Sequence, residues 1–257
     1  MKKGFLVSLV FASVAGAQAG VGPTSEYYLT AGDQGMLWVV QGGAVNRSWV
    51  GATGGEYPIA VGNEVRTLAV GSQGAEYTLG GVDTGARYAF PTGIGSAWDG
   101  TTDLNDNYLV DWSNGGVWRT DRDWSNPSLL FALGGFGERL GITYDFSDNT
   151  LWVSGWDLDV VEHFGMDGTL LGSFAPGFTS ITSLALDHAD GTLWMGTQGQ
   201  LGTFFQFAKD GTPLGSTTIA ELATQNTLGG EFQAVPEPAS IIALGVGLLL
   251  LARRRSR

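Results

Sequence analysis

The sequence contains no cysteine and only two histidines among its 257 residues. The absence of cysteine excludes disulfide bonds, cysteine-ligated zinc, iron–sulfur clusters and thiol catalysis. Charged residues make up only 15% of the chain, below the usual ~25%, so a coiled coil or a solvated helical bundle is not expected. Two histidines also leave little material for a histidine-rich metal site or a histidine-based catalytic triad.

Glycine and aromatic residues, in contrast, are abundant. The chain has 41 glycines, about twice the usual share of ~7%, together with 11% aromatic residues and nine tryptophans. So many large rings argue against disorder, and so many glycines are typical of tight turns between short strands. The composition therefore predicts an all-β fold.

The charge is unevenly distributed along the chain. The formal net charge is −12, and all 25 acidic residues lie between Glu26 and Glu237. Six of the 13 basic residues lie at the two ends of the chain, so residues 20–252 hold 25 acids against 7 bases. A body this acidic repels phosphate backbones, which argues against a nucleic-acid partner.

The N-terminus has the three parts of a secretory signal. A lysine pair at positions 2 and 3 precedes an apolar run over Phe5–Ala15, and Ala17-Gln18-Ala19 then supplies the small-x-small pattern that signal peptidase accepts. The apolar run is shorter than the ~20 residues that a membrane-spanning helix needs. We therefore expect residues 1–19 to be a signal peptide that is cleaved after Ala19.

The C-terminus has a different order of parts. Pro236-Glu237-Pro238 is followed by an uncharged segment, Ala239–Ala252, and then by the basic residues Arg253, Arg254, Arg255 and Arg257. As a helix the segment would be about 21 Å long, and arginines that snorkel towards the head groups could cover the mismatch with a ~30 Å hydrocarbon core. The pattern predicts a single transmembrane helix with the arginines on the cytoplasmic side. A core helix of the globular body is the alternative, but it does not explain the arginine cluster.

The three C-terminal parts together resemble the PEP-CTERM sorting signal of Gram-negative bacteria, over residues 235–257. In that family the membrane enzyme exosortase recognises the signal. The resemblance implies processing near Pro236, Glu237 and Pro238, and delivery to the cell surface or to an extracellular polysaccharide matrix. The precursor would be anchored in the inner membrane. The resemblance does not extend to the body, residues 20–234.

The body contains an internal repeat. Residues 141–155 align with residues 183–197 at an offset of 42 without a gap, and residues 164–173 align with residues 207–216 at an offset of 43. Weaker copies lie upstream. A period of 40–45 residues is typical of a β-propeller blade.

Each repeat unit is predicted to hold four short strands. In the two clear copies the first strand ends at Tyr144 or Leu186, and Asp-Gly turns separate the last two strands. The other three strands are expected at Thr150–Val153 or Thr192–Met195, at Val160–Phe164 or Phe204–Phe207, and at Leu170–Phe174 or Pro213–Thr217. Four strands per unit predict a propeller of about five blades, with four or six left open. The 183–201 stretch also resembles the propeller repeat of bacterial two-component sensor ectodomains, which bears on the fold and not on signalling.

The tryptophans divide into two groups by their phase in the repeat. Trp38, Trp152 and Trp194 follow the period and are expected to pack between blades. Four tryptophans outside that phase are candidates for an exposed aromatic surface, and packing under turns is the alternative. These are Trp112, Trp118, Trp124 and Trp156.

One segment carries alternating oxygen donors that could suit calcium. Asp103, Asn105 and Asn107 are spaced like the first ligands of a calcium loop. The full loop pattern fails, however, because Tyr108 stands where glycine is needed. Turn chemistry explains Asp and Asn equally well, so calcium binding and turn formation are alternatives here, and no other cofactor is indicated.

The body has no marked catalytic constellation. It lacks a G-x-S-x-G nucleophile elbow, and neither His163 nor His188 has an evident partner. We therefore expect a non-enzymatic surface or matrix protein whose loops bind exopolysaccharide or another protein. The alternative is a secreted metal-dependent hydrolase or lyase with its site in the propeller channel. Three or more channel carboxylates that converge on one point would favour the enzyme.

Overall fold

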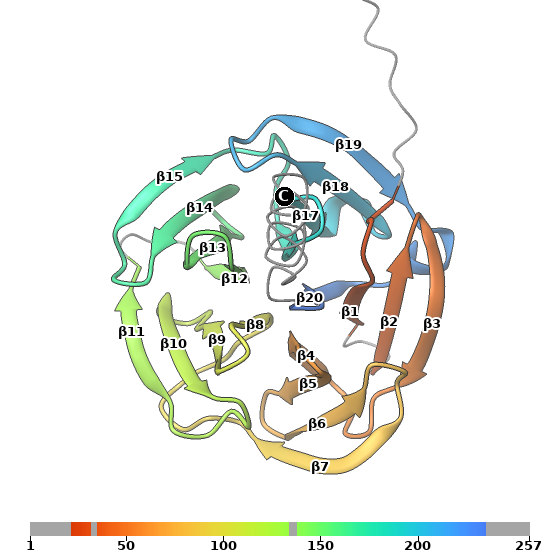
Figure 1. Cartoon of the computed structure of the whole chain (residues 1–257), viewed down its shortest axis with the longest axis vertical. Helices are drawn as coiled ribbons and strands as arrows, with labels where there is room; N and C mark the ends of the chain where they lie inside the picture. The colour runs from red at the N-terminus through yellow and green to blue at the C-terminus, as the bar shows by residue number, and fades with distance from the viewer. Residues whose placement is uncertain (1–21, 32–34, 134–137, 235–257) are drawn as a thin grey trace, which may run out of the picture.

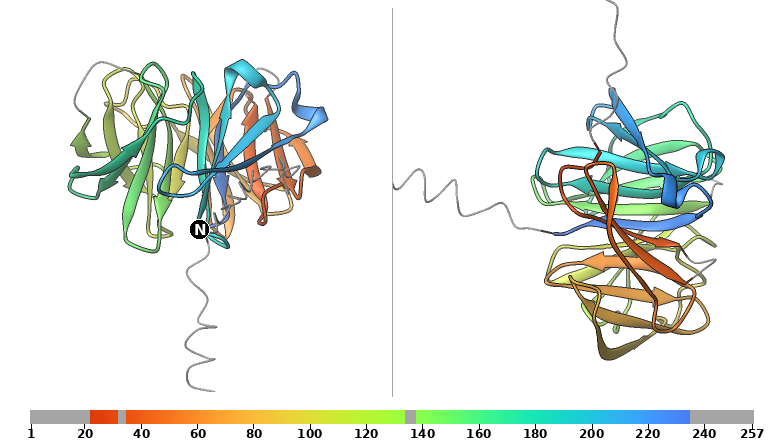
Figure 2. Two further views of the ribbon diagram at one scale, coloured as in Figure 1. Left: turned by 90° about the horizontal axis from the view of Figure 1, so that it is seen from above. Right: turned by 90° about the vertical axis from the view of Figure 1, so that its right-hand side faces the viewer.

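The computed structural model describes residues 22–31, 35–133 and 138–234. These residues form five four-stranded antiparallel sheets around a common axis, so the protein is a five-blade β-propeller (Figure 1). Seen from the side, the twisted sheets form a disc (Figure 2). The predicted all-β class and the count of five blades are confirmed.

Each blade runs from an inner strand at the channel to an outer strand at the rim. In that order, blade one contains β20 (Thr227–Phe232), β1 (Tyr27–Ala31), β2 (Met36–Gln41) and β3 (Ala44–Val50). Blade two contains β4 (Glu56–Val61), β5 (Glu64–Ala69), β6 (Gln73–Thr78) and β7 (Asp83–Ala89). Blade three contains β8 (Gly100–Thr102), β9 (Asp106–Val110), β10 (Gly116–Asp121) and β11 (Ser128–Ala132). Blade four contains β12 (Arg139–Asp145), β13 (Thr150–Gly155), β14 (Val160–Gly165) and β15 (Leu170–Phe174). Blade five contains β16 (Ile181–Asp187), β17 (Thr192–Thr197), β18 (Thr203–Phe207) and β19 (Pro213–Thr218). Short 3₁₀ helices lie at η2 (Gln198–Gln200) and η3 (Ala220–Leu222).

Blades four and five follow the repeat of the sequence strand by strand. The predicted strands of both units coincide with observed strands to within three residues at each end. Gly168 and Gly211 in the two Asp-Gly turns have φ values of +82° and +84°, in the left-handed region that glycine adopts without strain. Local turn chemistry and strand periodicity therefore agree with the tertiary structure of these two blades.

Blade one is closed by the two ends of the body. β20 supplies its inner strand and pairs with β1, with Tyr27 opposite Phe232. β2 is consequently the third strand of its blade, so Trp38 in β2 is not equivalent to Trp152 and Trp194, which lie in the second strands β13 and β17. The predicted equivalence of Trp38 was wrong because the sequence repeat does not reveal that the ring closes inside a blade. Trp38 nevertheless packs against the core cluster between blades five and one, so its predicted packing between blades is confirmed.

The two faces of the disc differ in which strand ends they carry. We call the face where the inner strands begin the start face, and the opposite face the end face. Ala234, just after β20, donates its backbone N–H to the carbonyl of Val61 at the end of β4, at 2.8 Å. Pro23, at the other described end of the body, accepts from the N–H of Gly42 in the β2–β3 turn at 3.0 Å. Both described ends of the body therefore lie on the end face.

Apolar clusters between neighbouring blades form the core. Trp194 is 1% exposed and packs with Tyr27 and Phe204 between blades five and one. Trp152 occupies the equivalent place one blade earlier and is 3% exposed. These two tryptophans pack between blades as predicted.

Trp124 corrects the prediction of an exposed indole. It is 0% exposed and packs with Leu68 and Leu109 between blades two and three. Trp124 has a φ of +64°, and its backbone bends in a turn in which the carbonyl of Asp121 accepts its N–H. A Cβ at Gly100 would stand 2.9 Å from the indole, so the glycine makes room for the ring. The predicted exposure was wrong because the β10–β11 turn folds inward.

Side chains link the inner strands, which belong to separate sheets. Asp99, just before β8, accepts from Gly230 N and Gly100 N, both at 2.9 Å, through Oδ1. Its Oδ2 accepts from Ile142 N at 3.3 Å and from Leu184 N at 3.4 Å. One carboxylate thus contacts the inner strands of blades one, three, four and five.

A second layer of bonds follows the same repeat. Thr101 accepts from Tyr144 N and Thr143 accepts from Leu186 N, each across 43 residues. Thr143 also donates to Glu231 in β20 at 3.3 Å. Hydroxyls and carboxylates therefore take the place of a backbone ladder between neighbouring blades.

Burial controls the protonation of the two channel carboxylates. Glu231 is 1% exposed, and burial raises its pKa well above the usual range, against the opposing effect of its hydrogen-bond donors. Burial likewise raises the pKa of Asp99; its backbone N–H donors oppose this shift, and the nearby negative charge of Glu231 adds to it.

No helix among the described residues is long and apolar enough to cross a membrane. The predicted signal peptide, residues 1–19, and the predicted transmembrane helix, Ala239–Ala252, both lie outside the described residues.

We expect Trp194→Ala and Trp124→Ala each to lower the free energy of unfolding by about 3–5 kcal/mol, because each removes a fully buried indole. Urea unfolding followed by circular dichroism measures this loss. Trp112→Ala, which truncates a partly exposed indole, is the control and should cost clearly less. Equal unfolding midpoints for the Trp124 and Trp112 variants would contradict the inward packing of Trp124.

The raised pKa of Glu231 predicts a dependence of stability on pH. The pKa of Glu231 is higher in the folded than in the unfolded protein. At pH values between these two pKa values, folding takes up a proton, so the free energy of unfolding falls as pH rises through this range. The slope is at most about 1.4 kcal/mol per pH unit for one group. Glu231→Gln should therefore lose less stability than the unchanged protein between about pH 5 and about pH 8.

Chemical unfolding at the two pH values tests this, with the exposed Glu221→Gln as the matched control. A Glu231→Gln variant with the same pH dependence as the Glu221→Gln control would refute the assignment.

Candidate functional site

The propeller channel holds two carboxylates, Asp99 and Glu231, among the described residues of the inner strands and their ends. Both are buried, and protein donors occupy them: backbone N–H groups on Asp99, and Thr143 and the N–H of Phe232 on Glu231. Two carboxylates do not meet the criterion of three converging acids. The arrangement ties strands together, and protein donors engage these oxygens.

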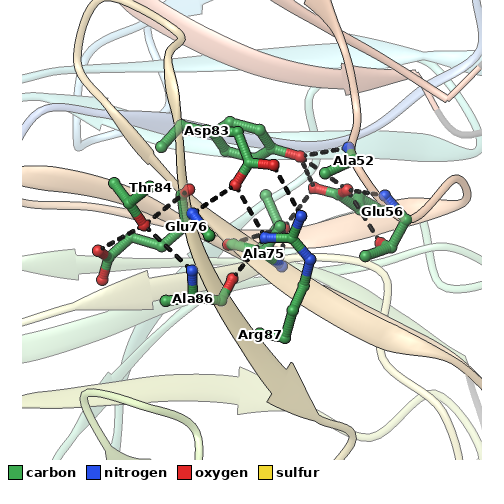
Figure 3. A network of polar contacts seen from close by, with 12 residues as sticks. Ala52, Glu56, Ala75, Glu76, Asp83, Thr84, Ala86 and Arg87 are labelled. Atoms are coloured by element: carbon green, nitrogen blue, oxygen red, sulfur yellow. Dashed lines mark hydrogen bonds and ion pairs between the residues drawn. The ribbon is translucent and has the colours of Figure 1, made fainter.

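Glu56, also on an inner strand, points into its own blade instead of the channel. It accepts from the hydroxyls of Tyr77 at 2.8 Å and of Thr67 at 2.5 Å (Figure 3). On the outer side of the same blade Arg87 pairs with Asp83 at 2.7 Å. The acids of blade two are thus used within the blade.

A cluster of three potential metal ligands lies at the end face. Oxygen or nitrogen atoms of Asp145, Asp148 and His163 lie within 4.8 Å of one another. The ammonium of Lys209, from the next blade, is 2.5 Å from Asp145 Oδ2 and supplies a positive charge there. The His163 ring stacks on Trp152 at a centroid distance of 4.0 Å, and burial lowers the pKa of His163, which favours the neutral ring. The cluster works as an ion pair between blades four and five, and a metal ion would compete with Lys209.

His188 has a packing role. Its ring meets Phe146 edge to face at 5.0 Å, and burial lowers the pKa of His188 to about 4. A neutral imidazole in this contact agrees with its place in a repeat turn.

Of the three calcium candidates, Asp103 and Asn105 lie in the β8–β9 turn and Asn107 lies in β9; protein donors already engage Asp103 and Asn107. Asp103 accepts from the backbone N–H groups of Asn105 and Asp106 at 2.8 and 2.7 Å. Asn107 Oδ1 accepts from the Arg122 guanidinium at 2.6 Å. Turn formation accounts for these contacts, and a calcium ion at this turn stays a prediction.

A row of aromatic rings crosses the start face from blade two to blade four. Tyr57 and Trp98 are 4.8 Å apart, Trp98 and Trp112 are 6.4 Å apart, and Trp112 and Trp156 are 5.7 Å apart, measured between centroids. Interplanar angles of 71–86° make each contact edge to face. All four side chains are partly exposed. We call these four residues the aromatic row.

The sequence predicted half of this row. Trp112 and Trp156 were candidates for an exposed aromatic surface, and both belong to it. Trp118 lies outside the row and packs against the core between blades two and three. Tyr57 and Trp98 were missed; the signal that could have found them is that each stands at the start of an inner strand.

Two acids flank the row. Glu138 lies just before β12, and its backbone carbonyl accepts from the N–H of Trp156, the residue before the exposed Asp157. Burial, followed by the negative charge of Asp157, raises the pKa of Glu138. Among the residues that the structure describes, neither acid forms an ion pair.

The sorting residues follow directly after the described body. The signal-peptidase residues Ala17 and Ala19, the motif Pro236-Glu237-Pro238 and the arginines from Arg253 to Arg257 lie outside the described residues. Ala234, the last described residue, is anchored on the end face.

Solved structures support the fold. A chain of the nidogen/laminin complex is 12% identical, with a TM-score of 0.57, over 83% of this chain and 100% of the other. A catalytically inactive virginiamycin B lyase from Staphylococcus aureus with quinupristin is 13% identical, with a TM-score of 0.49, over 77% of this chain and 68% of the other. A Bacteroides caccae protein of unknown function is 11% identical, with a TM-score of 0.48, over 76% and 73% of the two chains. The similarity to the chain of the nidogen/laminin complex shows the fold alone.

No curated protein matches the sequence. The family description that matches is "PEP-CTERM protein-sorting motif", over residues 234–256. The match begins at the residue that ends the described propeller, and it implies that the chain is exported and sorted by exosortase. The chain is thus a five-blade β-propeller that carries a PEP-CTERM sorting motif.

Proposed function

We propose that the protein is a non-enzymatic binding module that a Gram-negative bacterium displays on its surface or in its extracellular matrix. In this proposal signal peptidase removes residues 1–19, and residues 20–234 fold as the propeller. Residues 235–257 form the sorting segment, whose helix anchors the precursor in the inner membrane until exosortase acts.

The position of Ala234 is the observation that carries the proposal. Its N–H is held by Val61 on the end face, and the sorting motif begins at that residue. With Val235 alone between the anchored Ala234 and Pro236, the end face must lie next to the site of processing. The start face then points away from that site, with its aromatic row accessible.

Binding is favoured over channel catalysis because the channel acids bond to the protein itself. Asp99 and Glu231 are almost fully buried. The alternative function is a hydrolase or lyase with a metal ion in the channel. To bind that ion, Asp99 and Glu231 would have to give up their hydrogen bonds to the protein. The only group of three potential ligands found among the described residues lies at the end face, beside Lys209.

The matrix itself is the ligand source we favour. A polysaccharide or protein of the extracellular matrix is what a sorted surface protein meets, and a rigid disc of loops can hold such a ligand without rearranging. A role in biofilm belongs to this proposal.

Glu237→Ala should leave unprocessed precursor in the membrane, because Glu237 is the only charged side chain between two prolines that fix the backbone. In a host with exosortase, mass spectrometry of the surface fraction should find mature protein that lacks Arg253–Arg257. Glu221→Ala, which removes an exposed acid on the propeller, should be processed normally.

Recovery of peptides that join Ala252 to Arg253 from the surface fraction would refute the sorting proposal. Normal processing of the Glu237→Ala variant would refute the role of the glutamate.

A further inference from the structure

Several of the largest rings of this protein are fully buried between blades. Trp124 and Trp194, for example, are 0% and 1% exposed. The aromatic row instead leaves four rings partly open along one line on the start face. Leu158, two residues after Trp156 in the sequence, is also exposed. A contiguous exposed apolar patch of this kind marks an interaction surface.

The chemistry of the rings indicates what they bind. An aromatic face carries negative charge density and its edge carries positive density, so the face attracts C–H groups and cations. A pyranose ring has an apolar face of C–H groups that can lie flat on such a surface. Neighbouring rings are nearly perpendicular, so a sugar chain along the row would meet ring faces and ring edges in turn.

The acids beside the row add a charge preference. Glu138 and Asp157 are neighbours, because Trp156, the residue before Asp157, donates its N–H to the Glu138 carbonyl, and neither acid has a cationic partner among the described residues. Two adjacent carboxyl groups repel each other when both are ionised, and a bound cation relieves this repulsion. The net charge of −12 further opposes anionic ligands and close approach of a second copy of the chain.

The row is preorganised by backbone bonds. Trp112 N donates to the carbonyl of Ser96 at 2.9 Å, and Trp156 N donates to the carbonyl of Glu138 at 2.7 Å. Asp111 accepts from Gly95 N at 2.9 Å and fixes the loop before Trp98. Because the rings are already held in place, little ordering entropy is lost on binding.

We propose that the aromatic row, with Glu138 and Asp157, is a binding site for a polysaccharide that carries amino groups. The sugar units contact the exposed parts of Trp98, Trp112 and Trp156, and an ammonium group binds to the acid pair. This inference rests on the proposed binding function and names the ligand class of the same face. Neutral glycans, anionic glycans and basic peptides are the occupants that the experiment must separate from it.

The test uses the purified full-length chain in a detergent without a sugar head group. Isothermal titration calorimetry compares a β-1,4-linked glucosamine hexamer with cellohexaose and with an alginate oligomer of the same length. We expect the glucosamine hexamer to bind most tightly, and its affinity to fall as salt is raised. Trp156→Ala should lower the affinity for the glucosamine hexamer at least about tenfold.

Asp157→Asn is the variant that keeps the fold, because Asp157 is exposed. This variant should lower the affinity for the glucosamine hexamer by about threefold to fivefold and leave any binding of cellohexaose unchanged. Glu221→Gln, an exposed acid on the same face outside the row, is the matched control and should bind like the unchanged protein.

Three outcomes would overturn the inference: no binding of the glucosamine hexamer, equal binding of cellohexaose, alginate or a lysine hexapeptide, or binding that neither variant weakens. If the protein is sorted normally in cells but fails this test, only the ligand class is wrong. If sorting fails, the proposed surface display is wrong whatever the hexamer does.

Discussion

The carboxylate of Asp99 links four of the five blades. Inner strands of neighbouring blades belong to separate sheets, so their backbone N–H groups on the channel side need acceptors other than a strand ladder. Asp99 accepts from four of them, on β8, β12, β16 and β20. A buried N–H without a partner costs about 1–3 kcal/mol, so one aspartate supports much of the centre of the ring. The hydroxyls of Thr101 in β8 and Thr143 in β12 likewise accept backbone N–H groups from the inner strand of the next blade.

Because the channel acids bond to the protein itself, we expect ligands to bind on the faces of the disc. The polar groups that point inward bond to the protein, and the blades turn their large apolar side chains towards one another. The loops of the start face hold the aromatic row beside Glu138 and Asp157. The end face holds both described ends of the body and the inter-blade ion pair of Lys209.

Local patterns in the sequence predicted blades four and five well. Their strands carry the repeat, and their Asp-Gly turns have the backbone angles that the residues imply. The blade count followed from the period. The position of Trp38 did not follow, because the strand that completes blade one lies about 190 residues away in the sequence. No local pattern marks such a pairing.

Two other features depend on tertiary structure in the same way. Trp124 is out of phase with the repeat, and only the inward bend of its turn buries it. Asp99 has no counterpart at the repeat offset, where Gly141 stands, so the repeat could not identify it. The aromatic row combines residues from three blades, and only the ring arrangement brings them together.

The closure of blade one has a consequence for the order of events during export. The chain crosses the membrane from its N-terminus, so β1, β2 and β3 emerge first, and β1 has an unpaired edge until β20 arrives. β20 ends two residues before Ala234, where the sorting segment begins. Ring closure must therefore wait for nearly complete translocation, and until then the open edge of β1 is available to other strands. A cut beyond Ala234 leaves the closed disc whole, whereas a cut a few residues earlier would remove the strand that locks it.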